Sequence, residues 1–123
     1  MTGQPELKPG ERIDSLGVRN WLVIQSEAAF RFSIDAVLLA HFASMGARVS
    51  AIDLGTGTGA IALFLLARGA SRVSGVDNNP DVVDMATRTA AMNGLSDRLS
   101  FACCDVKAIR SCFSAGVCDL VTL

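Results

Sequence analysis

A glycine-rich segment between a strand-like run and a helix-like run constrains the fold of this chain more than any other feature. It reads Ala51-Ile52-Asp53-Leu54-Gly55-Thr56-Gly57-Thr58-Gly59. Glycine at three alternate positions allows a tight turn and lets a ligand approach the main chain where a β-carbon would collide. Amide groups at the start of the following helix would point into the crevice at the carboxyl end of the strand. The segment predicts a ligand-binding strand, loop and helix of an α/β sheet.

Strand and helix signals alternate after Gly46. We expect strands at residues 49–54, 72–76, 99–103 and 120–123, a helix at 58–68 that stops at Gly69, and a short helix at 106–113. Between the second and third strands, Asn79 and Pro80 are typical of a helix start and Gly94 of its end. The inner face of that helix is predicted to carry Val82, Val83, Ala86, Ala90 and Asn93. This alternation predicts a Rossmann-like, doubly wound parallel sheet with right-handed crossovers.

The first 46 residues show different patterns. Residues 1–17 are predicted to form a polar arm. Two short strands at 20–25 and 28–32, joined by a turn at Ser26 and Glu27, are predicted to form a hairpin. Apolar residues from Ile34 to Met45 recur at helical spacing, and His41 on that stripe is expected to be a core residue. We therefore divide the chain into an N-terminal arm, hairpin and helix at 1–46 and a ligand-binding domain at 47–123, incomplete at its C-terminus.

Charge and composition exclude several classes of function. Eleven Lys and Arg against twelve Asp and Glu give a formal net charge of −1, so a polyanionic partner would need a local basic patch. A signal peptide and a run of about 20 apolar residues are both lacking, and we expect a cytoplasmic protein. The spacing of Cys103, Cys104, Cys112 and Cys118 does not fit a zinc site, so we expect reduced, mostly buried thiols and no metal.

Acidic residues near the glycines favour one kind of ligand. The spacing is G-x-G-x-G rather than the dinucleotide fingerprint, and the Asp53 carboxylate directly before the loop would repel a pyrophosphate. S-adenosylmethionine carries a sulfonium and an ammonium but no phosphate, so a nearby anion helps to hold it. Asp77, 22 positions beyond Gly55, would accept hydrogen bonds from the ribose hydroxyls, and Asp105 would reach the adenine amino group.

Each of these residues also has a purely structural interpretation. The glycines could form only a tight turn, and Asp77 could cap the turn made with Asn78, Asn79 and Pro80. Asp105 could equally well cap the short helix that follows it. A ligand site explains the three together, because each lies at the carboxyl end of a successive parallel strand. An NAD-dependent oxidoreductase is disfavoured by the glycine spacing and by Asp53.

With these residues in place, the chain resembles the class I S-adenosylmethionine-dependent methyltransferases over about residues 48–123. The motifs are the segment from Asp53 to Gly59, then Gly75-Val76-Asp77, then Cys104-Asp105. Upstream, Gly10-Glu11-Arg12-Ile13-Asp14-Ser15-Leu16, Ile24-Gln25 and the segment from Phe30 to Ala40 are similar to the N-terminal signature of bacterial tRNA-valine adenine-N6 methyltransferases of the small-domain group.

The resemblance implies methylation of the exocyclic N6 amine of an adenine in tRNA, with S-adenosylmethionine as cofactor. In that family an Asn-Pro-Pro-Tyr motif after the fourth strand holds the amine. We expect that motif to follow Leu123, beyond the end of this sequence, and we therefore assign no catalytic residue within it. Alternatives are another amine, such as a protein glutamine or an rRNA base, or an inactive cofactor-binding fragment.

The same resemblance adds two residues to the predicted cofactor site. By similarity Phe32 and Asp35 border the methionine end of the cofactor, although Asp35 could instead complement a helix dipole. The predicted cofactor-binding residues are Phe32, Asp35, Asp53, Gly55, Thr56, Gly57, Gly59, Asp77, Asn78, Asp105 and Val106.

Overall fold

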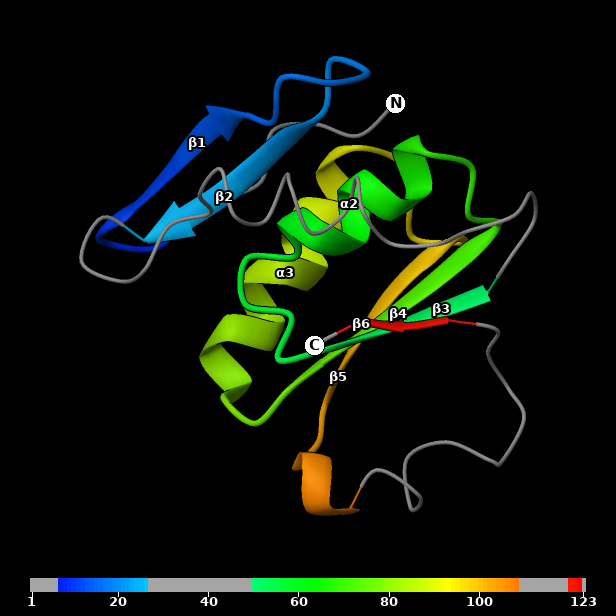
Figure 1. Ribbon diagram of the computed structural model, residues 1–123. Helices are drawn as coiled ribbons and strands as arrows, with labels where there is room; N and C mark the ends of the chain where they lie inside the picture. Colours follow the sequence, from blue (N-terminus) through cyan, green and yellow to red (C-terminus); the bar gives the residue numbers. More distant parts are fainter. Residues whose placement is uncertain (1–6, 27–49, 109–119, 123) are drawn as a thin grey trace.

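A computed structural model describes residues 7–26, 50–108 and 120–122 (Figure 1). Its centre is a parallel sheet of β3 (Ser50–Leu54), β4 (Arg72–Asp77), β5 (Leu99–Cys103) and β6 (Leu120–Thr122). The order across the sheet is β5-β4-β3-β6. The chain therefore moves outward from β3 to β5 and then returns to the other side of β3. The predicted parallel α/β sheet is confirmed, and its strand order reverses beside β3, where open α/β sheets bind ligands.

Two helices cover one face of the sheet (Figure 1). The helix α2 (Ala60–Ala67) connects β3 to β4, and α3 (Pro80–Met92) connects β4 to β5. The sequence of α2 is apolar almost all round, and Ala62, Leu63 and Leu65 are fully buried. The cluster that contains α2 also includes Leu16 and Val23 from the N-terminal region. The apolar residues of α2 thus belong to one core shared by the sheet and the N-terminal region.

The boundaries of α3 follow the predicted capping residues. Asn79 is the N-cap, its side chain accepting a 3.0 Å hydrogen bond from the amide of Asp81, and Pro80 is the first helical residue. The predicted inner face is partly wrong. Ala86 and Ala90 are buried as predicted, but Val82, Val83 and Asn93 are only half-buried. Met85 and Thr89 are buried although they were not predicted to be. The buried stripe is shifted because α3 packs against a second element, an N-terminal hairpin, as well as the sheet.

The N-terminal hairpin is built from a different pair of segments than predicted. The strand β1 (Glu11–Ser15), predicted as part of a polar arm, pairs antiparallel with β2 (Leu22–Ser26), and Ile13 lies opposite Ile24. The turn between them contains Arg19 and Asn20 with φ of 54° and 57°. Asn adopts this left-handed conformation more readily than most residues. Ser26 therefore ends a strand rather than starting a turn, and residues 28–32 lie outside the described part.

The hairpin docks on α3 because side chains of α3 form hydrogen bonds with the backbone of β2. The amide of Ile24 donates to Thr89 Oγ1 at 3.0 Å, and the amide of Leu22 donates to Asn93 Oδ1 at 2.8 Å. Asn93 Nδ2 in turn donates to the carbonyl oxygen of Leu22 at 2.7 Å. Residues two apart on a strand and four apart on a helix are both separated by about 6 to 7 Å. The outer edge of β2 thus has matching partners on the helix.

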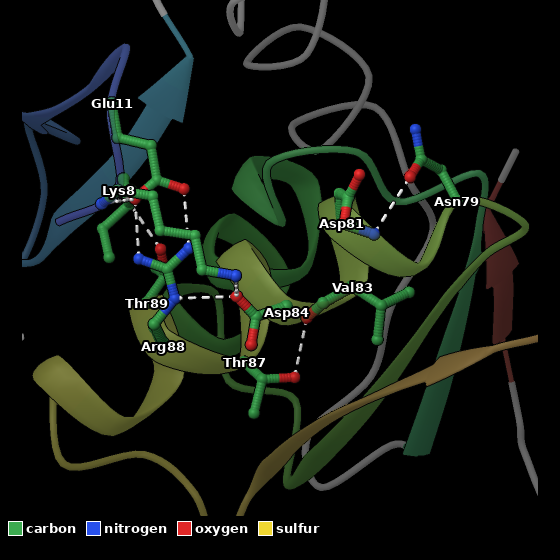
Figure 2. A network of polar contacts seen from close by, with 10 residues as sticks. Lys8, Glu11, Asn79, Asp81, Val83, Asp84, Thr87, Arg88 and Thr89 are labelled. Atoms are coloured by element: carbon green, nitrogen blue, oxygen red, sulfur yellow. Dashed lines mark hydrogen bonds and ion pairs between the residues drawn. The ribbon is translucent and has the colours of Figure 1, made fainter. Parts of the chain in front are cut away.

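An ionic network joins the same two elements (Figure 2). Arg88 of α3 donates two hydrogen bonds to the Glu11 carboxylate, at 2.7 and 2.6 Å, and a third to Asp84 at 3.0 Å. Lys8 Nζ lies 2.8 Å from the same oxygen of Asp84. The hydrogen bonds from Arg88 hold the pKa of Glu11 below its usual value, and the bond from Lys8 is the largest cause that lowers the pKa of Asp84. The network therefore favours charged carboxylates.

Several predicted segments fall outside the described residues. These are the helix at 34–45 with His41, the strand at 28–32 and the part of the short helix beyond residue 108. The predicted fourth strand at 120–123 is confirmed as β6 only as far as Thr122, because Leu123 also lies outside the described part. Within that part of the chain, no helix is long and apolar enough to span a membrane.

The two described cysteines differ from the prediction of reduced and mostly buried thiols. Cys103, the last residue of β5, is a free thiol but is exposed. Cys104 is buried but disulfide-bonded. The prediction is therefore wrong for the burial of Cys103 and for the redox state of Cys104, since spacing along the chain does not show which thiols the fold exposes or brings together.

Candidate functional site

A cavity of about 400 Å³ lies at the carboxyl ends of β3, β4 and β5. Six residues from the loops after these three strands line it: Gly55, Asp77, Asn78, Cys104, Asp105 and Lys107. Four of them belong to the predicted cofactor-binding set. The cavity therefore forms where parallel strands end beside the reversal of strand order, at the place that the glycine segment predicts.

The glycine loop is fixed to the neighbouring strand by its own backbone. The amide of Thr56 donates to the carbonyl oxygen of Val76 at 2.8 Å, and the amide of Gly57 donates to Asp77 Oδ2 at 3.2 Å. Gly59, the N-cap of α2, has a φ of 85°, a conformation that favours glycine. These bonds hold the loop next to the end of β4, so Gly55 opens onto the cavity.

Asp53 lies beneath the loop rather than on the cavity lining. Its side chain is 1% exposed, and its Oδ2 accepts a 2.8 Å hydrogen bond from Thr56 Oγ1. Thr56 is buried as well. Asp53 and Thr56 therefore shape the loop from below, and direct contact of either with a ligand stays a prediction.

Gly75 is required by packing beside the loop. A β-carbon on this residue of β4 would lie 2.5 Å from Phe101 Cδ1 and 2.7 Å from Thr56 Oγ1. The Phe101 ring also approaches Gly59, where a β-carbon would lie 2.9 Å from its Cζ atom. The ring of Phe101 on β5 thus fills the space that two glycines leave, and it supports the glycine loop from the sheet side.

Asp77 ends β4 with its carboxylate held in a fixed position. Oδ2 accepts from the amide of Gly57, and Oδ1 accepts from the amide of Asn79 at 3.1 Å. The bond to Asn79 is the turn cap that a purely structural role of Asp77 predicts. Asp77 also lines the cavity. A carboxylate has about four acceptor positions, so two remain for a ligand. The structural and ligand-binding interpretations are compatible, because the two amides fix the orientation of the side chain.

The carboxylate of Asp105, which follows β5, is also held in place by a backbone amide. Its Oδ1 accepts from the amide of Lys107 at 2.9 Å, which caps the short 3₁₀ helix η1 (Val106–Ala108). It too lines the cavity, next to Cys104 and Lys107, which sequence reasoning did not place in the site. Cys104 belongs to the Cys104-Asp105 motif, and Lys107 follows Asp105 by two positions. Their nearness to this motif is the sequence signal that could have placed Cys104 and Lys107 at the cavity.

Three more residues of the predicted site lie in or beside the loops that form the cavity. Gly57 belongs to the glycine loop, Asn78 lines the cavity, and Val106 begins η1. Among residues 7–26, 50–108 and 120–122, no three His, Cys, Asp or Glu side chains gather closely enough to hold a metal ion.

Two parts of the predicted site lie outside the described residues. The first part is Phe32 and Asp35, so their contact with the methionine end of a cofactor stays a prediction. The second is the end of the sequence at Leu123, so the Asn-Pro-Pro-Tyr motif expected after it likewise stays a prediction. The described cavity therefore contains no residue to which the sequence assigns a catalytic role.

Comparison with known proteins agrees with this geometry. A family model described as a methyltransferase domain matches residues 51–123, more than half of the chain. The tRNA1(Val) (adenine(37)-N6)-methyltransferase of Porphyromonas gingivalis strain W83 is 35% identical over 98 residues, 76% of this chain and 38% of that protein. The ribosomal protein L11 methyltransferase of Sorangium cellulosum is 39% identical over 62 residues, 50% of this chain and 20% of that protein. The chain thus spans about a fifth to two fifths of the length of these relatives.

Solved structures show the same fold. A putative transferase from Pyrococcus horikoshii matches with a TM-score of 0.71 at 17% identity, over 93% of this chain and 42% of that one. Geranyl diphosphate methyltransferase in complex with SAM matches with a TM-score of 0.55 at 20% identity, over 58% of this chain and 29% of that one. The glycine loop, the acidic residues after successive strands and the matched domain lead to one conclusion: the chain belongs to the class I S-adenosylmethionine-dependent methyltransferase family.

Proposed function

We propose that the protein transfers a methyl group from S-adenosylmethionine to the exocyclic N6 amine of an adenine in tRNA. The observation that carries this proposal is the extent of the tRNA methyltransferase match. It runs over 98 aligned residues, more than the 73 from residue 51 to 123, and so takes in sequence upstream of the methyltransferase domain. The 62-residue match to the L11 methyltransferase is short enough to lie within that domain.

The residues that line the cavity fit the cofactor. Asp77 and Asp105 present carboxylate oxygens from the ends of neighbouring strands, as hydrogen-bond acceptors for ribose hydroxyls and for an adenine amino group. Gly55 leaves open space where a side chain would stand. Phosphate binding is disfavoured by these two carboxylates, although Lys107 adds one positive charge at the rim.

Catalysis by this family is a problem of alignment. S-adenosylmethionine supplies a methyl group on a good leaving group, so the protein has to hold the nucleophilic amine in line with it. Asp77 would fix the nucleoside because its own orientation is set by the amides of Gly57 and Asn79. Asp105, held by the amide of Lys107, would fix the base. The described residues thus provide the cofactor half of the alignment.

The substrate is tested with the protein in its full length. Purified protein is incubated with cofactor labelled in the methyl group and with either a tRNA pool or ribosomal protein L11. We expect label in tRNA, recovered as N6-methyladenosine after digestion to nucleosides. Label in L11 and none in tRNA would establish the second candidate, methylation of a ribosomal protein, which the match to the L11 methyltransferase favours.

The role of Asp77 is tested by cofactor binding. Asp77→Ala should weaken the affinity for S-adenosylmethionine by about 1.5 to 3 kcal/mol, the range for hydrogen bonds to charged groups. Asp97→Ala, which removes the same charge from an exposed site before β5, serves as the matched control and should leave the affinity unchanged. Isothermal calorimetry measures both, and thermal melting verifies that the variants are folded. A dissociation constant for Asp77→Ala equal to that of the control would remove Asp77 from the site.

A further inference from the structure

Four of the eight Lys and Arg residues that the structure describes gather at the end of the sheet opposite the cavity. Arg68 is the C-cap of α2, and Arg72 is the first residue of β4, four positions later. Arg98 directly precedes β5, and Arg19 lies in the hairpin turn. All four are exposed. We call these residues the arginine patch.

The sheet brings two members of the arginine patch side by side. The strands β4 and β5 are parallel, and Val73 lies opposite Leu99, so the residues before them, Arg72 and Arg98, begin neighbouring strands. The amide of Val73 donates to the carbonyl oxygen of Arg98 at 2.9 Å. Like charges at neighbouring positions repel each other and reduce stability. An anion that binds between them would offset this repulsion.

Two other contacts draw the arginine patch toward the turn between α2 and β4. Arg19 Nη2 donates to the carbonyl oxygen of Ala67 at 2.8 Å, and Arg98 Nη2 approaches that of Ala70 at 3.3 Å. These carbonyls belong to the end of α2 and the turn after it, where a helix dipole favours cations. Bonds to these carbonyls account for the positions of Arg19 and Arg98. They do not account for Arg72, which follows the turn as the first residue of β4.

The two ends of the sheet differ in charge, although Asp97 directly precedes Arg98 at the basic end. Asp77 and Asp105 line the cavity at the carboxyl ends of the strands, with Asp53 buried close by, whereas Arg72 and Arg98 lie at the amino ends of β4 and β5. Of the other four described basic residues, Lys8, Arg12 and Arg88 each contact a carboxylate, and Lys107 lies at the cavity. No ion pair joins Arg19, Arg72 or Arg98 to a carboxylate within the described ranges. A chain of net charge −1 thus carries the local basic patch that a polyanion would need.

We propose that the arginine patch binds the phosphate backbone of the RNA substrate at a distance from the methylated base. The proposal rests on the proposed function, because it takes the substrate to be a folded RNA. The strand β4 has six residues, so the patch and the cavity are separated by about 20 Å. An RNA that occupies the cavity must be large enough to reach around the domain before it contacts the patch. Guanidinium groups suit this role because they form paired hydrogen bonds with phosphate.

The test compares three double variants of the full-length protein. Arg72→Gln with Arg98→Gln removes two charges from the patch, and Arg72→Lys with Arg98→Lys keeps them. Lys8→Gln with Arg12→Gln removes the same two charges from residues that pair with Asp84 and Asp14, and is the matched control. Affinity for a full tRNA transcript and for a short RNA hairpin carrying the target adenine is measured by fluorescence anisotropy over a range of salt concentrations. Melting curves verify folding.

We expect the Gln variant of the patch to bind full tRNA roughly tenfold more weakly near 0.1 M salt. The slope of log affinity against log salt should fall by about 0.9 for each phosphate contact removed. The Lys variant should keep most of the affinity, the control should match the parent protein, and the short hairpin should bind all four proteins alike. Equal tRNA affinity and salt slope in the Gln variant and the control would overturn the proposal.

The outcomes separate this proposal from the proposed function. If tRNA is methylated by a Gln variant whose affinity and salt slope are unchanged, the function stands and the patch does not bind the substrate. If the protein methylates no RNA, yet the Gln variant alone loses tRNA binding, the proposed function fails and the patch remains an RNA-binding surface. Equal weakening in the Gln and Lys variants would assign the effect to lost helix capping and would also overturn the proposal.

Discussion

The ion pair between Glu11 and Arg88 should set much of the stability of the docked hairpin. The side chain of Glu11 is 10% exposed and that of Arg88 is 19% exposed, and two short hydrogen bonds connect them. An exposed pair contributes about 0 to 1 kcal/mol, whereas breaking a fully buried one costs about 3 to 5 kcal/mol. The Glu11–Arg88 pair lies between these limits, so Glu11→Gln should lower the free energy of unfolding by about 2 kcal/mol at pH 7. Asp84→Asn changes a carboxylate with a side chain 45% exposed and should cost about 0.5 kcal/mol.

The same reasoning fixes the dependence on pH. The pKa of Glu11 is lowered from 4.5 in the folded protein, mainly by the hydrogen bonds from Arg88. A carboxyl with a depressed folded pKa adds stability above its unfolded pKa and loses it as the pH falls through the folded value. The parent protein should therefore lose stability below about pH 4.5 relative to Glu11→Gln, and the difference between the two should shrink toward pH 3.

Urea unfolding at pH 7 and at pH 3 measures this difference, and a double-mutant cycle of Glu11→Gln with Arg88→Met isolates the pair. We expect a coupling of about 2 kcal/mol at pH 7 and a smaller one at pH 3. Hydrogen exchange at the Ile24 amide, which bonds Thr89, reports on hairpin docking alone. A coupling below about 0.5 kcal/mol at pH 7, the size expected of an exposed pair, would refute the reasoning.

Two further substitutions test packing and hairpin docking by thermal or urea unfolding. Gly75→Ala should lower the free energy of unfolding by about 1 to 3 kcal/mol, because its β-carbon would meet Phe101 and Thr56, and adding Phe101→Leu should recover part of this stability. An unchanged melting temperature for Gly75→Ala would contradict the close approach. Asn93→Ala should lower the free energy of unfolding by about 1 to 3 kcal/mol, because it leaves the amide and carbonyl of Leu22 without their partner. Asn93→Asp keeps only the acceptor, so its stability should lie between those of the parent protein and Asn93→Ala. Equal stability of all three proteins would argue against the docked hairpin.

The parallel sheet could be predicted because its signals are local. The strand at residues 99–103 has the predicted bounds, and Asn79, Pro80 and Gly94 mark the ends of α3 as expected. Parallel strands buried on both faces form apolar runs, and caps and glycines separate them from helices. The position of the cavity followed from the same pattern, because the carboxyl ends of parallel strands meet at one edge of the sheet.

The hairpin could not be predicted in this way. Glu11 to Ser15 has the composition of a polar arm. It becomes a strand because it pairs with β2, and Glu11 also contacts Arg88, 77 positions away in sequence. Such a pairing leaves no periodic signal in either segment. The same cause explains the misplaced inner face of α3, since Thr89 is buried to bond the hairpin rather than to fill the core. Tertiary partners overrode the local pattern in both segments.

A two-stranded hairpin is only marginally stable by itself, and its unpaired edge invites pairing with another chain. Here the edge of β2 is covered by Thr89 and Asn93, whose four-residue spacing on α3 matches the two-residue spacing of Leu22 and Ile24. The helix therefore supplies the partners that a third strand would otherwise provide. Because α3 begins just after the cavity residues Asp77 and Asn78, any movement of the hairpin acts on a helix whose N-cap amide is bonded to Asp77. The bonds from Thr89, Asn93 and Arg88 thus tie the N-terminal hairpin directly to a helix of the methyltransferase domain.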